Sequence, residues 1–234
     1  IKGGKTFRWS GRYHENMISR ETTETALNVL ADFKPMVPEP ARDRGFVFLA
    51  NGHPAVQHDT LSHTRDPEFI VCDTMDLWIS TARKELDALL PEVDCIMMND
   101  DELKMYSGSA NIPESVKLLE EKGPEYVIIK KGEHGSLLFQ RGGGIFICPA
   151  FPVSTVVDPT GAGDSFAGAF IGHLASAGAE WKQKIRESML MGAVTASFTV
   201  ESFSLRRLSG ISKSEIEERA ELLRSYMTID TKTP

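Results

Sequence analysis

The feature that most constrains this chain is residues 156–170, which carry the sequence VVDPTGAGDSFAGAF. The two leading valines favour the end of a buried strand, which Asp158 and Pro159 would stop. The tripeptide at 161–163 has almost no side-chain bulk, and a helical pattern of small residues follows Asp164. The first N–H groups of a helix lack internal partners, and the helix dipole adds about half a positive charge there. Because glycines let a phosphate approach the backbone, the stretch predicts an anion-binding turn.

Asp164 is the unexpected member of this turn, because a carboxylate repels the phosphate that the turn would bind. That cost makes sense if Asp164 takes a proton or helps to hold a cation. The alternative is a plain strand-to-helix turn of an α/β core, with Asp164 as a solvated acid in the first helical turn. The motif taken alone leaves both interpretations open.

Length and composition favour one soluble α/β domain. A chain of 234 residues can bury a single core, and its 41% hydrophobic and 25% charged residues are ordinary for a globular protein. The formal net charge of −7 argues against nucleic-acid or acidic-membrane partners, which need a basic surface, but not against a nucleotide. No apolar run reaches the roughly 18 residues of a membrane helix.

The three cysteines, Cys72, Cys95 and Cys148, each lie in an apolar run that predicts a strand. None belongs to a C-x-x-C pair, so neither a zinc site nor a disulfide framework is indicated. Reduced core cysteines are typical of a cytoplasmic protein, which is the location that we expect.

The start of the chain predicts a small β unit. Residues 6–13 alternate large apolar with polar side chains, and residues 21–33 are expected to pair with them as a hairpin, although part of that segment also fits a helix. Residues 34–44 are rich in proline and charge and indicate a connector. We therefore expect a β segment over residues 1–33 and an α/β core over residues 34–234.

Continuous apolar strands alternate with helices from residue 45 onward, which predicts a mainly parallel sheet covered on both faces. The expected parallel strands are 46–50, 69–73, 95–98 and 126–129. The expected helices between them are 54–63, 76–90 and 114–121. Two antiparallel strands are expected at 136–139 and 145–148, and three closing helices at 163–177, 181–200 and 214–226.

A second polar piece, NDDE at residues 99–102, follows the third of these strands. Asn99 at the helix start and Glu102 three positions later fit a capping box, which is a purely structural role. Their oxygens also suit Mg²⁺, often through water, and ligands bind outside the carboxyl ends of strands in open α/β sheets. The two roles are compatible.

A third piece, IKKGEHG at residues 129–135, links the fourth strand to the antiparallel pair. Gly132 and Gly135 permit a tight turn, and two lysines place positive charge at a strand end. A solvated basic turn is the structural alternative. We expect His134 to be an exposed turn residue and His53 not to face the substrate.

These three pieces resemble the signatures of the ribokinase-like carbohydrate kinases, the PfkB family. D-x-T-G-A-G-D followed by S-F-x-G-x-F is highly specific, the glycine turn moderately so, and N-x-x-E only weakly. Their order matches that of the family, and the resemblance covers essentially the whole chain. It implies a ribokinase-like α/β fold, mainly a parallel sheet between helices, with residues 1–33 as a small β lid. The family's first strand and its Gly-Gly-Asn substrate motif would precede residue 1, so N-terminal strands are expected to be missing from this sequence.

The resemblance also implies an activity. The chain would belong to an enzyme that transfers a phosphoryl group from ATP, with Mg²⁺, to a hydroxyl group of a small sugar or nucleoside. Asp164 would be the base that takes the proton of that hydroxyl, and the backbone N–H groups of Gly161, Ala162 and Gly163 would form the anion hole. The lid often mediates dimers in this family, so a homodimer through the lid is a possible partner arrangement.

The residues that would contact ATP follow from the same resemblance: Lys130, Gly132, Gly135, Asp158, Thr160, Gly161 and Gly163. The family commonly has Thr where this chain has Lys130, so a lysine would contact phosphate as a point charge in place of a hydroxyl. Asn99 and Glu102 would hold Mg²⁺ through water. The substrate itself is not named by the sequence, although Trp9, Arg12 and Tyr13 on the lid are able to contact a ring.

Two other interpretations stay open at this point. A fragment or descendant of the same fold would be catalytically incompetent and act as a regulatory or binding protein. The intact turn around Asp164 argues against such decay, while the missing N-terminal segment argues for it. Gly4-Lys5-Thr6 also matches the tail of a P-loop, but a strand pattern follows it in place of an apolar helix.

Overall fold

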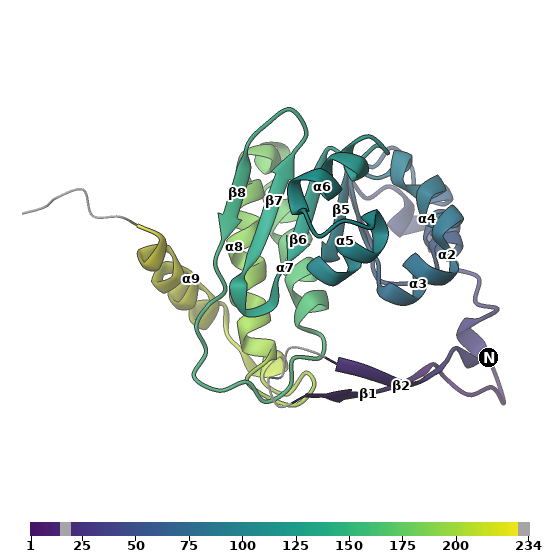
Figure 1. The fold of residues 1–234 in the computed structure, drawn as a ribbon, viewed down its shortest axis with the longest axis horizontal. Helices are drawn as coiled ribbons and strands as arrows, with labels where there is room; N and C mark the ends of the chain where they lie inside the picture. The colour runs from purple at the N-terminus through teal and green to yellow at the C-terminus, as the bar shows by residue number, and fades with distance from the viewer. Residues whose placement is uncertain (15–19, 229–234) are drawn as a thin grey trace, which may run out of the picture.

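The computed structural model describes residues 1–14 and 20–228 of the chain. Its first element is an antiparallel hairpin of β1 (Arg8–Tyr13) and β2 (Arg20–Ala26). This confirms the expected hairpin, and the 3₁₀ turn at Asn28–Leu30 shows where the ambiguous segment leaves the strand. Most of the expected hairpin connection, residues 15–19, lies outside the described residues. In Figure 1 the hairpin lies below the main body of the protein, at the end where the loop before α7 (Ala162–Ser176) is found.

The main sheet has six strands in the order of the sequence: β3 (Phe46–Leu49), β4 (Phe69–Asp73), β5 (Cys95–Asn99), β6 (Tyr126–Lys130), β7 (Ser136–Gln140) and β8 (Ile145–Cys148). The first four are parallel, and the last two pair antiparallel. All six expected strands are therefore confirmed. Because parallel strands all end at the same edge, the polar residues that follow them meet at the lower edge of the sheet in Figure 1.

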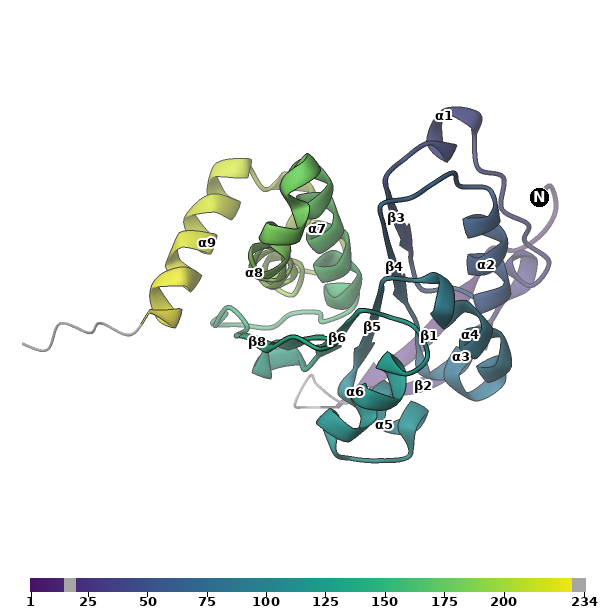
Figure 2. The same ribbon diagram turned by 90° about the horizontal axis from the view of Figure 1, so that it is seen from above.

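Helices cover both faces of this sheet (Figure 2). One face carries α2 (Pro54–Ser62), α3 (Asp76–Thr81), α4 (Arg83–Leu89), α5 (Asp100–Ser107) and α6 (Ile112–Glu120). The other carries α7 and α8 (Trp181–Thr199), with α9 (Lys213–Met227) packed on α8. The short α1 (Glu39–Arg42) lies in the proline-rich connector.

Alternate residues of the strands pack into two separate hydrophobic cores, one on each face of the sheet. Val71 and Met97 face α7 and α8, whereas Cys72 and Ile96 face the helices of the other layer. This alternation follows from the period of two of a β-strand, and burial of both sets explains why the strands are continuously apolar. All three cysteines are buried and form no disulfide among the described residues.

The expectation of one helix over residues 76–90 is wrong. The segment breaks at Ala82, whose backbone (φ −133°, ψ 35°) is not helical, into α3 and α4, and it ends in a 3₁₀ turn at Leu90–Glu92. The hydroxyls of Ser80 and Thr81 both donate to the carbonyl of Leu77, at 2.9 and 2.6 Å. Such side-chain bonds compete with the helical ladder, which accounts for the break. No helix in the described part of the chain has the length and apolar character needed to cross a membrane.

Candidate active site

A cavity of about 1100 Å³ opens at the carboxyl ends of β3 to β6. Tyr13 of the hairpin and the loop before α7 contribute to its walls. Most of the expected site residues line it: Asn99, Lys130, Gly132, Gly135, Thr160, Gly161, Ala162, Gly163 and Asp164. Asp158 and Glu102 do not line the cavity, but each forms a hydrogen bond with a residue that does, Thr160 and Asn99 respectively.

The expected strand end at Val156 and Val157 is wrong: both valines are exposed, and they lie in an irregular segment that follows β8, the last strand of the sheet. The N–H of Val157 donates instead to the carbonyl of Val200, just after α8, at 2.8 Å.

The loop before α7 has the conformation that an anion site needs. Gly161 adopts φ +83° at the N-cap, a left-handed conformation that favours glycine. The carboxylate of Asp158 accepts a 3.0 Å hydrogen bond from the N–H of Thr160 and so fixes the turn. Ala162 N–H donates to the carbonyl of Pro159 at 3.2 Å. The N–H groups of Gly161 and Gly163 donate to no backbone carbonyl within the described residues.

Asp164 lies in the first turn of α7, is exposed, and faces the cavity. This position fits a base that meets an acceptor hydroxyl, and it also fits a solvated acid at a helix start. No side chain caps this helix, so the positive end of its dipole is available to a bound anion.

The hairpin touches the same loop. The hydroxyl of Tyr13 shares a 3.0 Å hydrogen bond with the hydroxyl of Thr160. Two segments far apart in the sequence are thereby joined at the mouth of the cavity.

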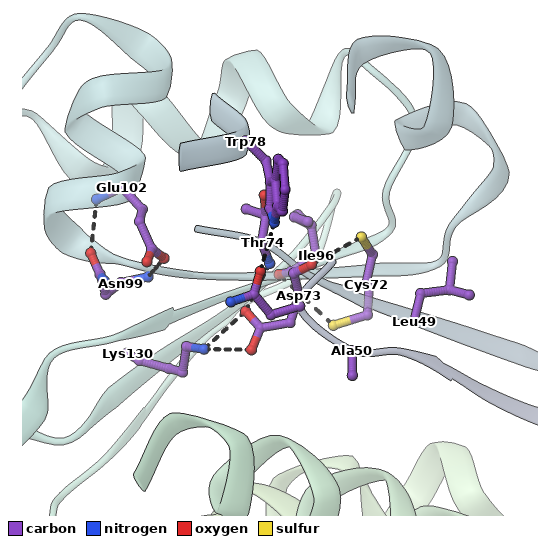
Figure 3. Close-up of polar contacts among 12 residues, drawn as sticks. Leu49, Ala50, Cys72, Asp73, Thr74, Trp78, Ile96, Asn99, Glu102 and Lys130 are labelled. Carbon is purple, nitrogen blue, oxygen red and sulfur yellow. Dashed lines mark hydrogen bonds and ion pairs between the residues drawn. The ribbon is translucent and has the colours of Figure 1, made fainter. Parts of the chain in front are cut away.

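The capping box at the start of α5 is complete. Glu102 N–H donates to Asn99 Oδ1 at 2.8 Å, and Asn99 N–H donates to Glu102 Oε2 at 2.7 Å (Figure 3). Glu102 is only 6% exposed, and this burial raises its pKa to about 7 against the opposing effects of the Asn99 N–H and Lys130. The structural role of both residues is therefore confirmed, and Glu102 Oε1 forms no hydrogen bond among the described residues.

Lys130 has a partner that the sequence analysis missed. Its Nζ lies 3.0 and 2.9 Å from the two carboxylate oxygens of Asp73, the last residue of β4 (Figure 3). Burial lowers the pKa of Lys130, but Asp73, Glu102 and Asp164 outweigh it and raise the pKa, so the ammonium stays charged. The sequence did contain a signal for this partner: Asp73 is an acid at the end of a continuous apolar strand, and that strand precedes the one that ends at Asn99.

The glycine turn is explained in part by packing. Gly132 (φ +53°) begins a 3₁₀ turn, and a Cβ on Gly135 would lie 2.1 Å from the carbonyl oxygen of Cys148 in β8. Gly135 is thus required by its contact with the neighbouring strand, whatever else it binds. His134 is exposed, and His53 caps α2 by accepting from the N–H of Ala55 at 3.1 Å. The expectation of an exposed turn residue is thereby confirmed for His134.

A family model described as pfkB family carbohydrate kinase matches residues 61–209, which contain all three sequence motifs and more than half of the chain. The chain belongs to the PfkB family of carbohydrate kinases. Members of this family generally use ATP and Mg²⁺, and sugars and nucleosides are their typical substrates.

Individual relatives agree with this family. The cytidine kinase of Thermococcus kodakarensis is 33% identical over 91 residues, which are 38% of this chain and 32% of that protein. Fructokinase-2 of Oryza sativa subsp. japonica is 33% identical over 122 residues, 49% of this chain and 35% of that protein. The matched segments thus span only about a third of the length of these relatives.

The crystal structure of the Methanocaldococcus jannaschii nucleoside kinase, an archaeal member of the ribokinase family, has the same fold. It superimposes with a TM-score of 0.73 and covers 94% of this chain and 70% of that one. Because the sequence identity is 18%, this similarity shows the fold alone. The ribokinase-like α/β fold expected from the sequence is confirmed.

Proposed function

We propose that the complete protein transfers the terminal phosphoryl group of ATP to a hydroxyl group of a sugar or nucleoside. The position of Asp164 carries this proposal: it lies in the first turn of α7, in the same cavity as Lys130 and the glycine loop. A carboxylate at this place is able to take the proton of an acceptor hydroxyl beside an anion-binding helix start.

Phosphoryl transfer needs alignment of two oxygens and neutralisation of charge more than covalent help. We assign the anion hole first to the N–H groups of Gly161 and Gly163, because that of Ala162 already donates within the loop. The N–H of Ala162 would join them once its 3.2 Å bond to the carbonyl of Pro159 opens. The dipole of α7 adds positive potential at the same point.

The ATP site would run from this loop along the glycine turn. Lys130 supplies a positive charge for the phosphates, and Thr160 and Asp158 shape the loop around them. The cavity also has apolar lining residues that suit a purine ring: Phe151, Val153, Val156, Ala193, Ala196 and Val200.

The corner at Asn99 and Glu102 fits Mg²⁺ held mostly through water. Glu102 keeps one carboxylate oxygen outside the capping box. No group of three or more His, Cys, Asp or Glu side chains is arranged for a metal in the described part of the chain. Mg²⁺ commonly binds proteins through one or two carboxylates, several waters and the substrate phosphates, so a sparse site of this kind is adequate. When bound, Mg²⁺ would neutralise charge on the phosphates.

We assign residues 1–33 as the lid and residues 34–234 as the kinase core. The bond between Tyr13 and Thr160 supports this assignment, because it joins the hairpin to the loop before α7, and both residues line the cavity. Phe7, Leu30 and Phe33 are exposed apolar side chains of the lid, and they support a homodimer through this segment. Sedimentation of the protein with all three changed to serine would test the dimer.

The test of the activity is direct detection of a phosphorylated product. The full-length protein is incubated with Mg·ATP and, separately, D-ribose, D-fructose, cytidine and adenosine, and the products are analysed by mass spectrometry. We expect one acceptor to gain a phosphoryl group and the reaction without acceptor to yield none. A protein that binds Mg·ATP yet phosphorylates no sugar or nucleoside would favour the regulatory alternative.

A further inference from the structure

The Lys130 ammonium lies at a junction between three parts of the site. From the end of β6 it donates to both carboxylate oxygens of Asp73, at 3.0 and 2.9 Å, across the end of β5, which lies between β6 and β4. On its other side it approaches the start of α7: a Cβ built on Gly163 would lie 3.3 Å from Nζ. Gly163 therefore provides the room that this lysine needs beside the helix start.

Asp73 is itself held in place. Its Oδ1 accepts from the N–H of Thr74 at 3.0 Å. The buried amide nitrogen of Gln57 lies 2.9 Å from the carbonyl oxygen of Asp73 and also contacts the carbonyls of Leu49 and Ala50. Asp73 is 2% exposed, and its carboxylate is held by the Thr74 N–H while Gln57 holds its backbone, so the carboxylate presents one orientation to Lys130.

Stability alone does not explain this pair. A buried ion pair loses so much hydration that apolar residues of the same size are often equally stabilising. The pair has instead a definite location, between the carboxyl edge of the sheet and an uncapped helix start.

We propose that Asp73 is a positioning residue for phosphoryl transfer, which holds the Lys130 ammonium against Gly163 at the start of α7. This inference rests on the proposed function. There the ammonium stabilises charge on the transferred phosphoryl group as a fixed donor, without a reorganisation cost at the moment of reaction.

The pairing also decides which carboxylate the lysine neutralises. Glu102 and Asp164 both act electrostatically on Lys130. An ammonium free to move would pair with Asp164 and compete for the carboxylate that must accept a proton. Held by Asp73, Lys130 faces the phosphoryl site and leaves Asp164 available to the acceptor.

A double-mutant cycle tests whether Asp73 acts through Lys130. With the acceptor that the product screen identifies, we expect Lys130→Met to lower kcat about 100-fold and Asp73→Asn about 10-fold, with the acceptor KM nearly unchanged. The double variant should be no slower than Lys130→Met, because Asp73 has nothing left to position. Independent losses that multiply in the double variant would overturn the proposal, as would a wild-type kcat in Asp73→Asn.

A binding measurement keeps the test independent of turnover. Calorimetry with Mg·ATP and Mg·ADP should show that Lys130→Met and Asp73→Asn both reduce the preference for ATP, while ADP affinity changes little. Asp73→Asn leaves a buried ammonium without its carboxylate and could therefore destabilise the fold. The double variant removes both charges, so it provides a second variant in which ATP preference can be measured without an unpaired buried charge. Equal ATP preference in all these variants would contradict the proposal.

Lys122→Met is the matched control. Lys122 pairs with Asp87 at 3.5 Å on the surface, so its loss removes a lysine–aspartate pair outside the cavity. Activity and ATP preference should remain at wild-type levels. Failure of the unsubstituted protein to bind Mg·ATP would overturn the proposed function itself, whereas an active enzyme with a multiplicative cycle would overturn only the role of Asp73.

Discussion

Two helix starts of this protein lie beside the cavity, and they differ in which of their N–H groups are left without partners. At the start of α5, Asn99 and Glu102 exchange hydrogen bonds with each other's backbone in a complete capping box. At the start of α7 no side chain caps the helix, and the N–H groups of Gly161 and Gly163 donate to no carbonyl within the described residues.

This difference separates a finished structural turn from one that is able to bind a ligand. Helix N–H groups that already donate within the protein cannot also bind an anion well, whereas unpaired N–H groups at a positive helix end can bind one. The first turn therefore contributes mainly a buried carboxylate, and the second contributes donors, dipole and the acid Asp164.

The strongest challenge to this comparison is removal of the acid at the second helix start. Asp164→Asn preserves shape but removes the base, so we expect phosphoryl transfer to fall at least about 100-fold while Mg·ATP still binds. Product formation by mass spectrometry and ATP calorimetry check the two halves. An active variant would return Asp164 to the role of a solvated helix-start acid.

A second test changes only the backbone freedom of the loop. Gly161→Ala meets open space, with the nearest atom 4.0 Å away, but its φ of +83° is unfavourable for alanine. We expect about 1 kcal/mol of lost stability and at least about tenfold lower kcat, because a displaced loop misaligns its donors.

The control for that change is Gly108→Ala. Gly108 has φ +75°, also meets nothing within 4 Å, and ends α5 outside the cavity. It should lose similar stability in a denaturant titration and keep full activity. Equal loss of activity in both variants would show that backbone strain alone is responsible.

A third test concerns Mg²⁺ at the first helix start. Glu102→Gln keeps an acceptor for the Asn99 N–H but removes the charge, so the Mg²⁺ concentration that gives half-maximal activity should rise several-fold. A titration of activity against Mg²⁺ at fixed ATP measures it. An unchanged requirement would limit Asn99 and Glu102 to capping.

The raised pKa of Glu102 gives a fourth test, in metal-free buffer. Its pKa is about 7 in the folded chain against an ordinary 4.5, so the folded state holds the proton more tightly than the unfolded state. The resulting stabilisation is complete below about pH 4.5 and is lost as the pH rises through 7. The Tm of the wild type relative to Glu102→Gln should therefore fall over this window and level off above it. Parallel Tm curves would show that Glu102 does not hold this proton.

The smallest effect is expected at the hairpin. Tyr13→Phe removes the hydroxyl that bonds to Thr160 and leaves the ring in place. Since a single hydrogen bond contributes about 1 kcal/mol, the acceptor KM should rise only a few-fold, with little change in ATP binding. Steady-state kinetics with the identified acceptor would measure this change, and a wild-type KM would argue against a lid at this position.

The sequence by itself determined most of the fold and the outline of the site. The strands follow from continuous apolar runs, and the start of α7 follows from the small residues at 161–163 ahead of a helical pattern, although the strand expected before it is absent from the described residues. The capping box likewise follows from the spacing of Asn99 and Glu102, which are three residues apart. These features depend on hydrogen bonds and side-chain periods within a few residues, so a local pattern is enough to predict them.

Only the tertiary structure decided which of these groups meet. Lys130 and Asp73 are 57 residues apart, and they become partners because β5 lies between their strands and all three strands end at one edge. Gly135 is likewise required by its contact with a carbonyl of β8. Contacts of this kind depend on strand order and register, which arise only when the whole sheet has packed.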